Sequence, residues 1–201
     1  KVKESFGGSA RLEVTQAIER HIQEGAVART LTAARGRLTE VDLITPYEAK
    51  LASLVDLRAI GASNLRVIVD PIHGAGSGLL VRMLHASGLR VLEVRGEQSP
   101  NFGGVNPEPI APNLRSLIQL MSAGEADVGL ALDGDADRLG AVDERGEFFD
   151  SHRCYATILD HLADHRKMRG AIGKTVSSSV MVERIAASIA RYPKNGAAAR
   201  P

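Results

Sequence analysis

The sequence is poor in aromatic residues and cysteine, and it has no long apolar run. Aromatic side chains make up 3% of the 201 residues and tryptophan is absent, so any core is built from smaller aliphatic side chains. The single cysteine, Cys154, excludes an intramolecular disulfide. Its helical spacing with Ile158 and Leu162 indicates a buried small apolar residue. No apolar stretch approaches the roughly 20 residues of a membrane-spanning helix.

The charge is nearly balanced. The formal net charge is +1, which gives no electrostatic reason to expect binding to nucleic acid or to an anionic membrane. Basic residues between 29 and 37 are interrupted and lack interleaved aromatics, which is typical of a solvated face. The sequence has no signal-peptide pattern. We therefore expect a cytoplasmic protein that binds neither nucleic acid nor membrane.

The most informative stretch is Asp133–Arg138, which reads D-G-D-A-D-R. It lies between two apolar runs, Val128–Leu132 and Leu139–Val142. Carboxylates this close together repel one another, and a divalent cation is the usual relief. The first run reads as a buried strand, and open α/β sheets bind their ligands at the carboxyl ends of strands. The sequence thus predicts a Mg²⁺ site formed by Asp133, Asp135 and Asp137.

Other interpretations of this loop stay open. It could be a solvated acidic turn. In an EF-hand loop the three aspartates and Glu144 would take the first, third, fifth and twelfth positions, but Arg138 stands where glycine is required. A haloacid-dehalogenase-like phosphatase would need Thr or Val where Asp137 stands. We favour a metal loop for phosphoryl transfer, in which Arg138 hydrogen-bonds the phosphate.

A second stretch, Val67–Gly78, runs from an apolar strand through a small-residue loop into a helical pattern. The loop Gly74–Gly78 lacks the Lys-Ser/Thr pair of a P-loop, so we predict that its glycines allow close packing. We expect His73 to be a packing residue, because no second His or Cys lies nearby in the sequence. Pro100–Pro109 is too rich in glycine and proline for a helix or a central strand.

Strand and helix patterns alternate along the chain, which predicts α/β layers with a mainly parallel sheet. Thr45 is the expected N-cap of one helix, with Pro46 in its first turn. Asp143–Gly146 is the expected turn of a hairpin. Further elements are expected as helices at Val14–Glu24, Asn113–Met121, around Cys154–Leu162 and after Ser177–Ser179, and as a strand at Leu89–Val94.

These stretches together resemble the α-D-phosphohexomutases, the phosphoglucomutase/phosphomannomutase family. Asp133–Arg138 resembles the D-G-D-x-D-R metal loop of that family, and Asn101–Pro109 is similar to the N-F-x-x-x-x-P-x-P stretch that precedes the metal-loop strand. Val67–Gly78 resembles the equivalent turn in the family's second domain. The resemblance implies the three-layer second domain of a phosphohexomutase with parts of its neighbours.

By this resemblance, residues 1–38 are the end of domain 1, residues 39–164 are domain 2 and residues 165–190 begin domain 3. Residues 191–201 depart from the family and are expected to be an irregular tail. Neither the family's S-H-N-P serine loop nor its G-E-x-S-G sugar loop occurs in the sequence. We therefore expect a fragment, whose partners would include the missing domains.

The resemblance also implies a reaction. A phosphoserine would exchange its phosphoryl group with a hexose phosphate through a hexose bisphosphate, with Mg²⁺ held by Asp133, Asp135 and Asp137. Arg138 would bind the phosphate. Lys174, on the first strand of domain 3, would add positive charge; the alternative is a strand lysine that points to solvent. Lys1 would be the lysine beside the transferring phosphate. We expect this chain alone to be inactive; the alternative is an inert metal- or partner-binding remnant.

Overall fold

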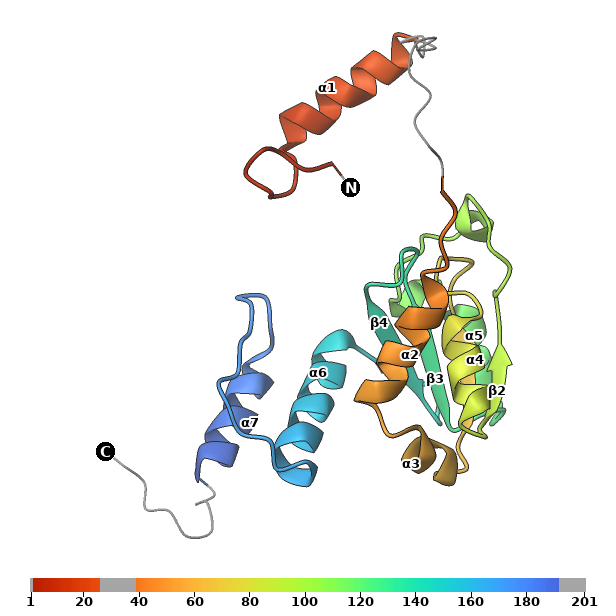
Figure 1. Ribbon diagram of the computed structural model, residues 1–201, viewed down its shortest axis with the longest axis vertical. Coiled ribbons are helices and arrows are strands. Elements are labelled where there is room, and N and C mark those ends of the chain that lie inside the picture. The colour runs from red at the N-terminus through yellow and green to blue at the C-terminus, as the bar shows by residue number, and fades with distance from the viewer. Residues whose placement is uncertain (1, 26–38, 192–201) are drawn as a thin grey trace. The chain divides into compact units, whose positions relative to one another are not determined.

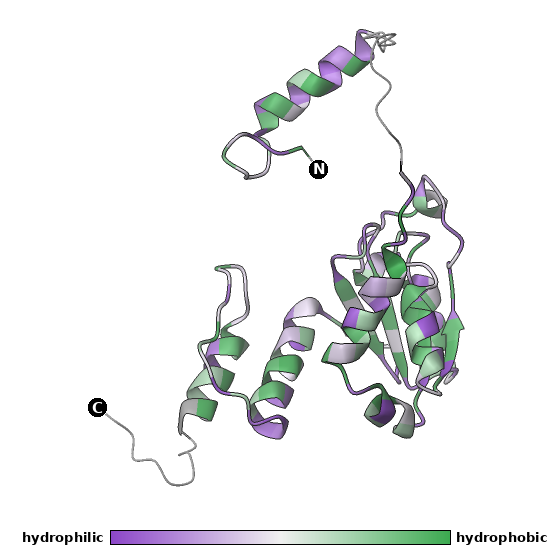
Figure 2. Cartoon of the chain, in the orientation of Figure 1, coloured by the Kyte–Doolittle hydropathy of each residue, from purple (hydrophilic) through white to green (hydrophobic). Residues whose placement is uncertain are grey.

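The computed structural model describes residues 2–25 and 39–191 (Figure 1). The chain divides into two compact units, Lys1–Asp42 and Leu43–Pro201. In the first unit, a bridge between Lys3 and Ser9 precedes helix α1, Leu12–Gln23. Figure 2 shows apolar and polar bands alternating along α1, yet none of its residues is buried. The helix predicted at Val14–Glu24 is confirmed and begins two residues earlier.

The second unit is built on a five-stranded sheet in the order β2-β1-β3-β4-β5. Strand β1 pairs in parallel with β2 and β3, whereas β4 is antiparallel to β3 and β5. The predicted α/β class is confirmed, but the sheet is mixed. The loop between β3 and β4 is too short for a parallel crossover, which needs roughly a dozen residues or more. The strands are β1 Arg66–Asp70, β2 Arg90–Glu93, β3 Val128–Leu132, β4 Leu139–Asp143 and β5 Phe148–Phe149.

Helices cover both faces of this sheet. Val67 and Val69 of β1 pack with Leu84 on one face, and Ile68 packs with Leu117 and Met121 on the other. Successive strand residues point to opposite faces, so this alternation creates two cores and the predicted three layers. The helices are α2 Ile44–Leu54, α3 Leu57–Ala62, α4 Leu79–Ala86, α5 Arg115–Ser122, α6 Ser151–Asp160 and α7 Val180–Arg191, with short 3₁₀ turns at Phe102–Gly104 and Ala111–Asn113 and a π-helix at His161–His165.

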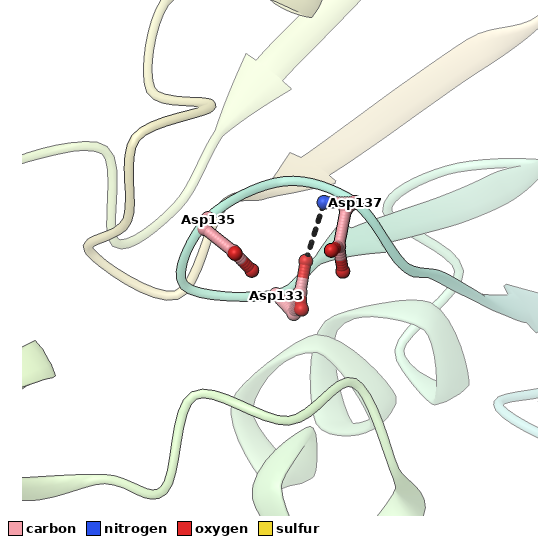
Figure 3. A group of neighbouring side chains, drawn as sticks. All are labelled: Asp133, Asp135 and Asp137. Atoms are coloured by element: carbon pink, nitrogen blue, oxygen red, sulfur yellow. Dashed lines mark hydrogen bonds between the residues drawn. The ribbon is translucent and has the colours of Figure 1, made fainter. Parts of the chain in front are cut away.

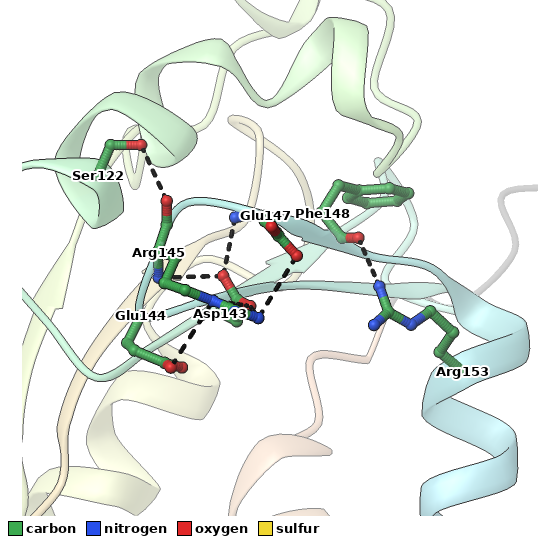
Figure 4. Close-up of polar contacts among 7 residues, drawn as sticks. All are labelled: Ser122, Asp143, Glu144, Arg145, Glu147, Phe148 and Arg153. Carbon is green, nitrogen blue, oxygen red and sulfur yellow. Dashed lines mark hydrogen bonds and ion pairs between the residues drawn. The ribbon is translucent and has the colours of Figure 1, made fainter.

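The predicted hairpin turn joins β4 to β5 (Figure 4). Asp143 Oδ1 accepts hydrogen bonds from the backbone N–H groups of Arg145, at 3.0 Å, and Glu147, at 2.8 Å. The Arg145 guanidinium lies 2.9 Å from Asp143 Oδ2. Gly146 has a φ of 81°, a left-handed conformation that suits glycine. The turn is therefore held by its own first side chain.

Two local predictions were wrong. Helix α2 begins at Ile44 with Leu43 at its N-cap, so Thr45 lies inside the first turn with Pro46. Residues 170–179 contain no strand, so Lys174 is not on one. A strand requires a neighbouring strand for its backbone hydrogen bonds, and the described residues provide none beside this segment. The helix start after Ser177–Ser179 is confirmed: the Ser179 hydroxyl accepts from the Met181 N–H at 3.1 Å.

No helix within residues 2–25 and 39–191 is long and apolar enough to cross a membrane. Of the predicted tail, Arg191 ends α7, and residues 192–201 lie outside the described residues.

Candidate metal centre

Asp133–Arg138 connects β3 to β4, and we call this segment the acidic loop. One carboxylate oxygen from each of Asp133, Asp135 and Asp137 lies within 4.8 Å of the others. Figure 3 shows the three carboxylates gathered on one side of the loop. Asp133 is buried, whereas Asp135 and Asp137 are exposed. The structure therefore brings together the three ligands that the sequence predicted.

The loop folds around the Asp133 side chain. Asp133 Oδ1 accepts hydrogen bonds from the backbone N–H groups of Asp137, at 2.8 Å, and Arg138, at 2.9 Å. The residue between the exposed aspartates, Ala136, takes a left-handed conformation with a φ of 59°. This turn brings carboxylates at alternate positions to the same side. Left-handed conformations of non-glycine residues are uncommon and gather at functional sites.

Asp133 is held in its charged form. Burial acts to raise the pKa of this carboxyl, but the hydrogen bonds and charge of Arg138 and the backbone N–H of Asp137 outweigh it, so the pKa lies below the ordinary value. The Arg138 Nε donates to Asp133 Oδ2 at 2.8 Å. A carboxylate oxygen accepts more than one contact, so Asp133 keeps the capacity to bind a cation.

The donor set fits a hard divalent cation. Three carboxylates supply oxygen ligands, and the remaining positions of such an ion are commonly filled by water or phosphate oxygens. The EF-hand interpretation is wrong, because strands β3 and β4 flank the loop where that motif requires helices. The cluster is therefore a candidate site for a hard divalent cation.

Arg138 lies at the edge of the cluster with 54% of its side chain exposed. Its Nη1 donates to Glu108 Oε1 at 2.5 Å, and its Nε lies 3.8 Å from Asp137 Oδ1. These contacts fix the guanidinium plane while Nη2 has no partner among the described residues. A planar guanidinium held in this way can donate to a phosphate oxygen. Sequence reasoning missed Glu108, whose only signal is its place within the Pro100–Pro109 stretch.

Two stretches that are distant in sequence, around Ala75 and around Pro107, pack against the acidic loop. The Ala75 N–H donates to the Gly134 carbonyl at 3.0 Å, and the Gly134 N–H donates to the Pro107 carbonyl at 3.1 Å. A Cβ at Gly134 would lie 2.9 Å from the Phe102 ring, and one at Gly76 would lie 2.6 Å from Leu132 Cδ1. The glycines therefore serve close packing, as predicted, but against the acidic loop and its strand.

The other residues for which the sequence predicted a role are His73, Lys174 and Lys1. The His73 ring donates from Nδ1 to the Glu97 carbonyl at 2.7 Å, which agrees with a packing role. The ammonium of Lys174 lies 2.7 Å from Glu183 Oε1. Lys1 lies outside the described residues. The catalytic roles of Arg138, Lys174 and Lys1 stay predictions.

A pocket of about 510 Å³ adjoins the acidic loop. Asp137 and Arg138 line it on one side, and Cys154 and Tyr155 of α6 line it on another. Cys154 is half-buried, and burial is the main cause that raises the pKa of its thiol, followed by the charge of Asp150. Its thiol is therefore not activated as a nucleophile.

Comparison with known proteins agrees with this geometry. Residues 45–146 match the family model described as "Phosphoglucomutase/phosphomannomutase, alpha/beta/alpha domain II". The chain belongs to this family. The matched residues contain strands β1 to β4 and the acidic loop, so the predicted family is confirmed.

Individual relatives of the phosphohexomutase family carry different names. The chain is 34% identical over 151 residues to a phosphoglucomutase/phosphomannomutase of Thermococcus kodakarensis, covering 75% of this chain and 33% of that protein. It is 35% identical over 170 residues to a phosphoglucosamine mutase of Parafrankia sp., covering 84% and 36%. The solved structure of a "putative phosphomannomutase" from Thermus thermophilus matches with a TM-score of 0.66 and 32% identity, covering 89% and 40%. The chain thus spans about a third of the curated relatives' length.

Proposed function

We propose that this chain is the metal-loop part of a phosphohexomutase, which interconverts hexose 1-phosphate and hexose 6-phosphate through a phosphoserine enzyme and a bisphosphate intermediate. One observation carries the proposal: three carboxylates converge within 4.8 Å of one another, beside an arginine that is held in place. Asp133, Asp135 and Asp137 would hold Mg²⁺, and a bound Mg²⁺ would offset the charge that develops during phosphoryl transfer.

The chain's own residues position the phosphate. Asp133 and Glu108 hold the Arg138 guanidinium, and its Nη2 would donate to a phosphoryl oxygen. By the family resemblance, Lys174 would add positive charge and Lys1 would be the lysine beside the transferring phosphate. A hexose phosphate and a hexose bisphosphate are the ligands, and the rest of the protein is the partner. Such substrates suit a cytoplasmic enzyme. The relatives' names differ in sugar, so the hexose is left at the level of its class.

The second candidate is metal binding without turnover by this chain alone. No serine of the 201-residue sequence stands in an S-H-N-P context, and no G-E-x-S-G loop is present. Without a serine in that context to carry the phosphoryl group, we expect the isolated polypeptide not to form the bisphosphate. We therefore expect the chain to bind the cation weakly, with a Kd on the order of 10⁻⁴ M or above, because no phosphate completes the site.

The test combines metal binding with turnover. Mn²⁺, followed by electron paramagnetic resonance, should bind the chain and lose its binding in Asp135→Asn. Glu144→Gln, in the neighbouring β4–β5 turn, is the matched control and should bind as the unaltered chain does. Assayed with glucose 1-phosphate, its bisphosphate and Mg²⁺, the chain should show no turnover. Submicromolar affinity would contradict the proposed site, and turnover that Asp135→Asn abolishes would contradict the second candidate.

A further inference from the structure

A buried ion pair lies outside the acidic loop and has no part in the proposed reaction. Asp70, the last residue of β1, is 0% exposed, and the Arg95 side chain is 15% exposed. Arg95 Nε donates to Asp70 Oδ1 at 2.9 Å, and its Nη2 donates to Asp70 Oδ2 at 2.5 Å. Such a bidentate pair fixes both geometry and orientation. Asp70 is the last residue of β1 and Asp133 directly follows β3, so two neighbouring parallel strands each lead to a buried aspartate at the same edge of the sheet.

The pair holds the turn that follows β1. Asp70 Oδ1 also accepts a hydrogen bond from the Ile72 N–H at 3.1 Å. The Arg95 carbonyl accepts one from the His73 N–H at 2.9 Å. Ile72 and His73 have φ values of 48° and 56°. A left-handed β-branched residue is unfavourable and persists only where its surroundings enforce it. Asp70 and Arg95 supply that enforcement from both sides of the turn.

The far end of this turn touches the acidic loop. The Ala75 N–H donates to the Gly134 carbonyl at 3.0 Å. A Cβ at Gly74 would lie 2.8 Å from the Gly134 carbonyl oxygen and 3.0 Å from that of Asp133, so the two backbones are in contact. These contacts reach the first two residues of the acidic loop directly.

We infer that Asp70 and Arg95 are positioning residues for the metal centre: through the turn 71–75 they set where the acidic loop holds its carboxylates. The inference rests on the proposed function in that it takes the acidic loop to be the metal site. The ion pair does not touch the cation; it acts by fixing the backbone against which Asp133 and Gly134 lie.

The experiment uses the full chain and the Mn²⁺ ion as probe. Asp70→Asn removes the charge with little change of shape, and Arg95→Lys removes the bidentate fork. Each should weaken Mn²⁺ binding by about 10-fold, as expected when residues behind the ligands are altered. The matched control is Asp127→Asn, which breaks the pair between Arg66 Nη2 and Asp127 Oδ1, 2.8 Å apart, at the opposite end of β1. That variant should bind Mn²⁺ as the unaltered chain does.

Gly74→Ala tests the contact between the turn 71–75 and the acidic loop. The added methyl would press on the carbonyl oxygens of Gly134, Pro71 and Asp133, while the Asp70 and Arg95 side chains themselves are unaltered. Its binding should weaken by a similar factor, and adding it to Asp70→Asn should cost less than the two separate losses combined. Gly173→Ala, whose added Cβ meets nothing within 4 Å, is its control.

A metal-independent readout separates this inference from the proposed function. Amide hydrogen exchange of the apo chain should show faster exchange at Ala75, Asp137 and Arg138 in Asp70→Asn, with the amides of β1 still protected. If the unaltered chain binds no Mn²⁺, the proposed metal site fails while the exchange data still decide the inference. If Mn²⁺ binds through Asp135 but Asp70→Asn and Gly74→Ala bind it equally well, with unchanged exchange, the inference is overturned.

Discussion

Asp133 has two roles, and both depend on the charged form of its carboxylate. It stabilises the acidic loop by accepting two backbone N–H groups and the Arg138 side chain, and it offers an oxygen to the cluster. The charged form serves both, since it is the better acceptor and the only form suited to a cation. Without a cation, repulsion from Asp135 and Asp137 opposes that form, but three donors at hydrogen-bond distance outweigh two exposed and solvent-screened charges.

This balance predicts a pH-dependent contribution to stability. Asp133→Asn should lower the free energy of unfolding by about 1–3 kcal/mol at pH 7, because charged hydrogen bonds are lost at a buried position. The folded pKa of Asp133 is lowered from the ordinary 3.8, so the folded state binds fewer protons than the unfolded state. The contribution is therefore fully present above the unfolded pKa and is lost as the pH falls through the folded pKa.

Urea unfolding of both proteins across the acidic range measures this effect. The difference between them should be constant near neutrality and shrink once the pH drops below 3.8. Comparison with Asp133→Asn removes the contributions of other carboxyls, such as Asp127 and Asp143, whose pKa values are also lowered. A difference that grows on acidification would show that Asp133 is not stabilised as a carboxylate in the folded protein.

Among the secondary-structure elements, the apolar pattern of the sequence correctly predicted the strands whose residues are buried in the core. The runs Val67–Val69 and Val128–Leu132 became neighbouring strands, because residues alternately fill the two cores. Where burial gave no constraint, the predictions were less accurate. Helix α2 has no buried residue and begins one residue before the expected N-cap, Thr45. Lys174 lies in a segment with no neighbouring strand among the described residues, which a local sequence pattern could not reveal.

Helix α3 illustrates how packing outweighs local preference. Gly61 lies within α3, where alanine would be favoured by about 1 kcal/mol. However, a Cβ at Gly61 would lie 1.8 Å from the Ser87 carbonyl oxygen, which is a backbone atom at the end of α4. We expect Gly61→Ala to destabilise the protein by about 1–3 kcal/mol net, because α3 must move away from α4.

Thermal and urea unfolding test this expectation. Gly170→Ala serves as control, since a Cβ there meets nothing within 4 Å and its stability should be nearly unchanged. If Gly61→Ala were more stable than the unaltered chain, helix propensity would dominate at this site and the close approach of α3 and α4 would be easily relaxed.

For the molecule as a whole, the sequence predicted those parts of the candidate site whose residues are close together in the chain. It did not predict contacts between residues that are far apart in the chain. The acidic loop was found because Asp133, Asp135 and Asp137 alternate within it. The residues of the pairs Asp70–Arg95 and Glu108–Arg138 are separated by 25 and 30 positions in the sequence, so only the fold brings them together. No single-sequence pattern specifies which of 25 basic residues will meet a given carboxylate.

The division into two units predicts that the second folds without the first. None of the described residues of Lys1–Asp42 is buried, and Phe6, Leu12 and Ile22 are about 70% exposed. Both hydrophobic cores and the acidic loop lie within Leu43–Pro201. A chain beginning at Leu43 should therefore lose only the helical circular-dichroism signal of α1, and should keep its Mn²⁺ binding and a Tm within about 3 °C of the full chain, since 1 kcal/mol corresponds to roughly 2–4 °C at this size. A matched truncation within α7, which packs on α6 and buries Val182, should lower the Tm markedly. A Tm lowered by about 8 °C or more on removing residues 1–42 would mean that the first unit contributes to the stability of the second.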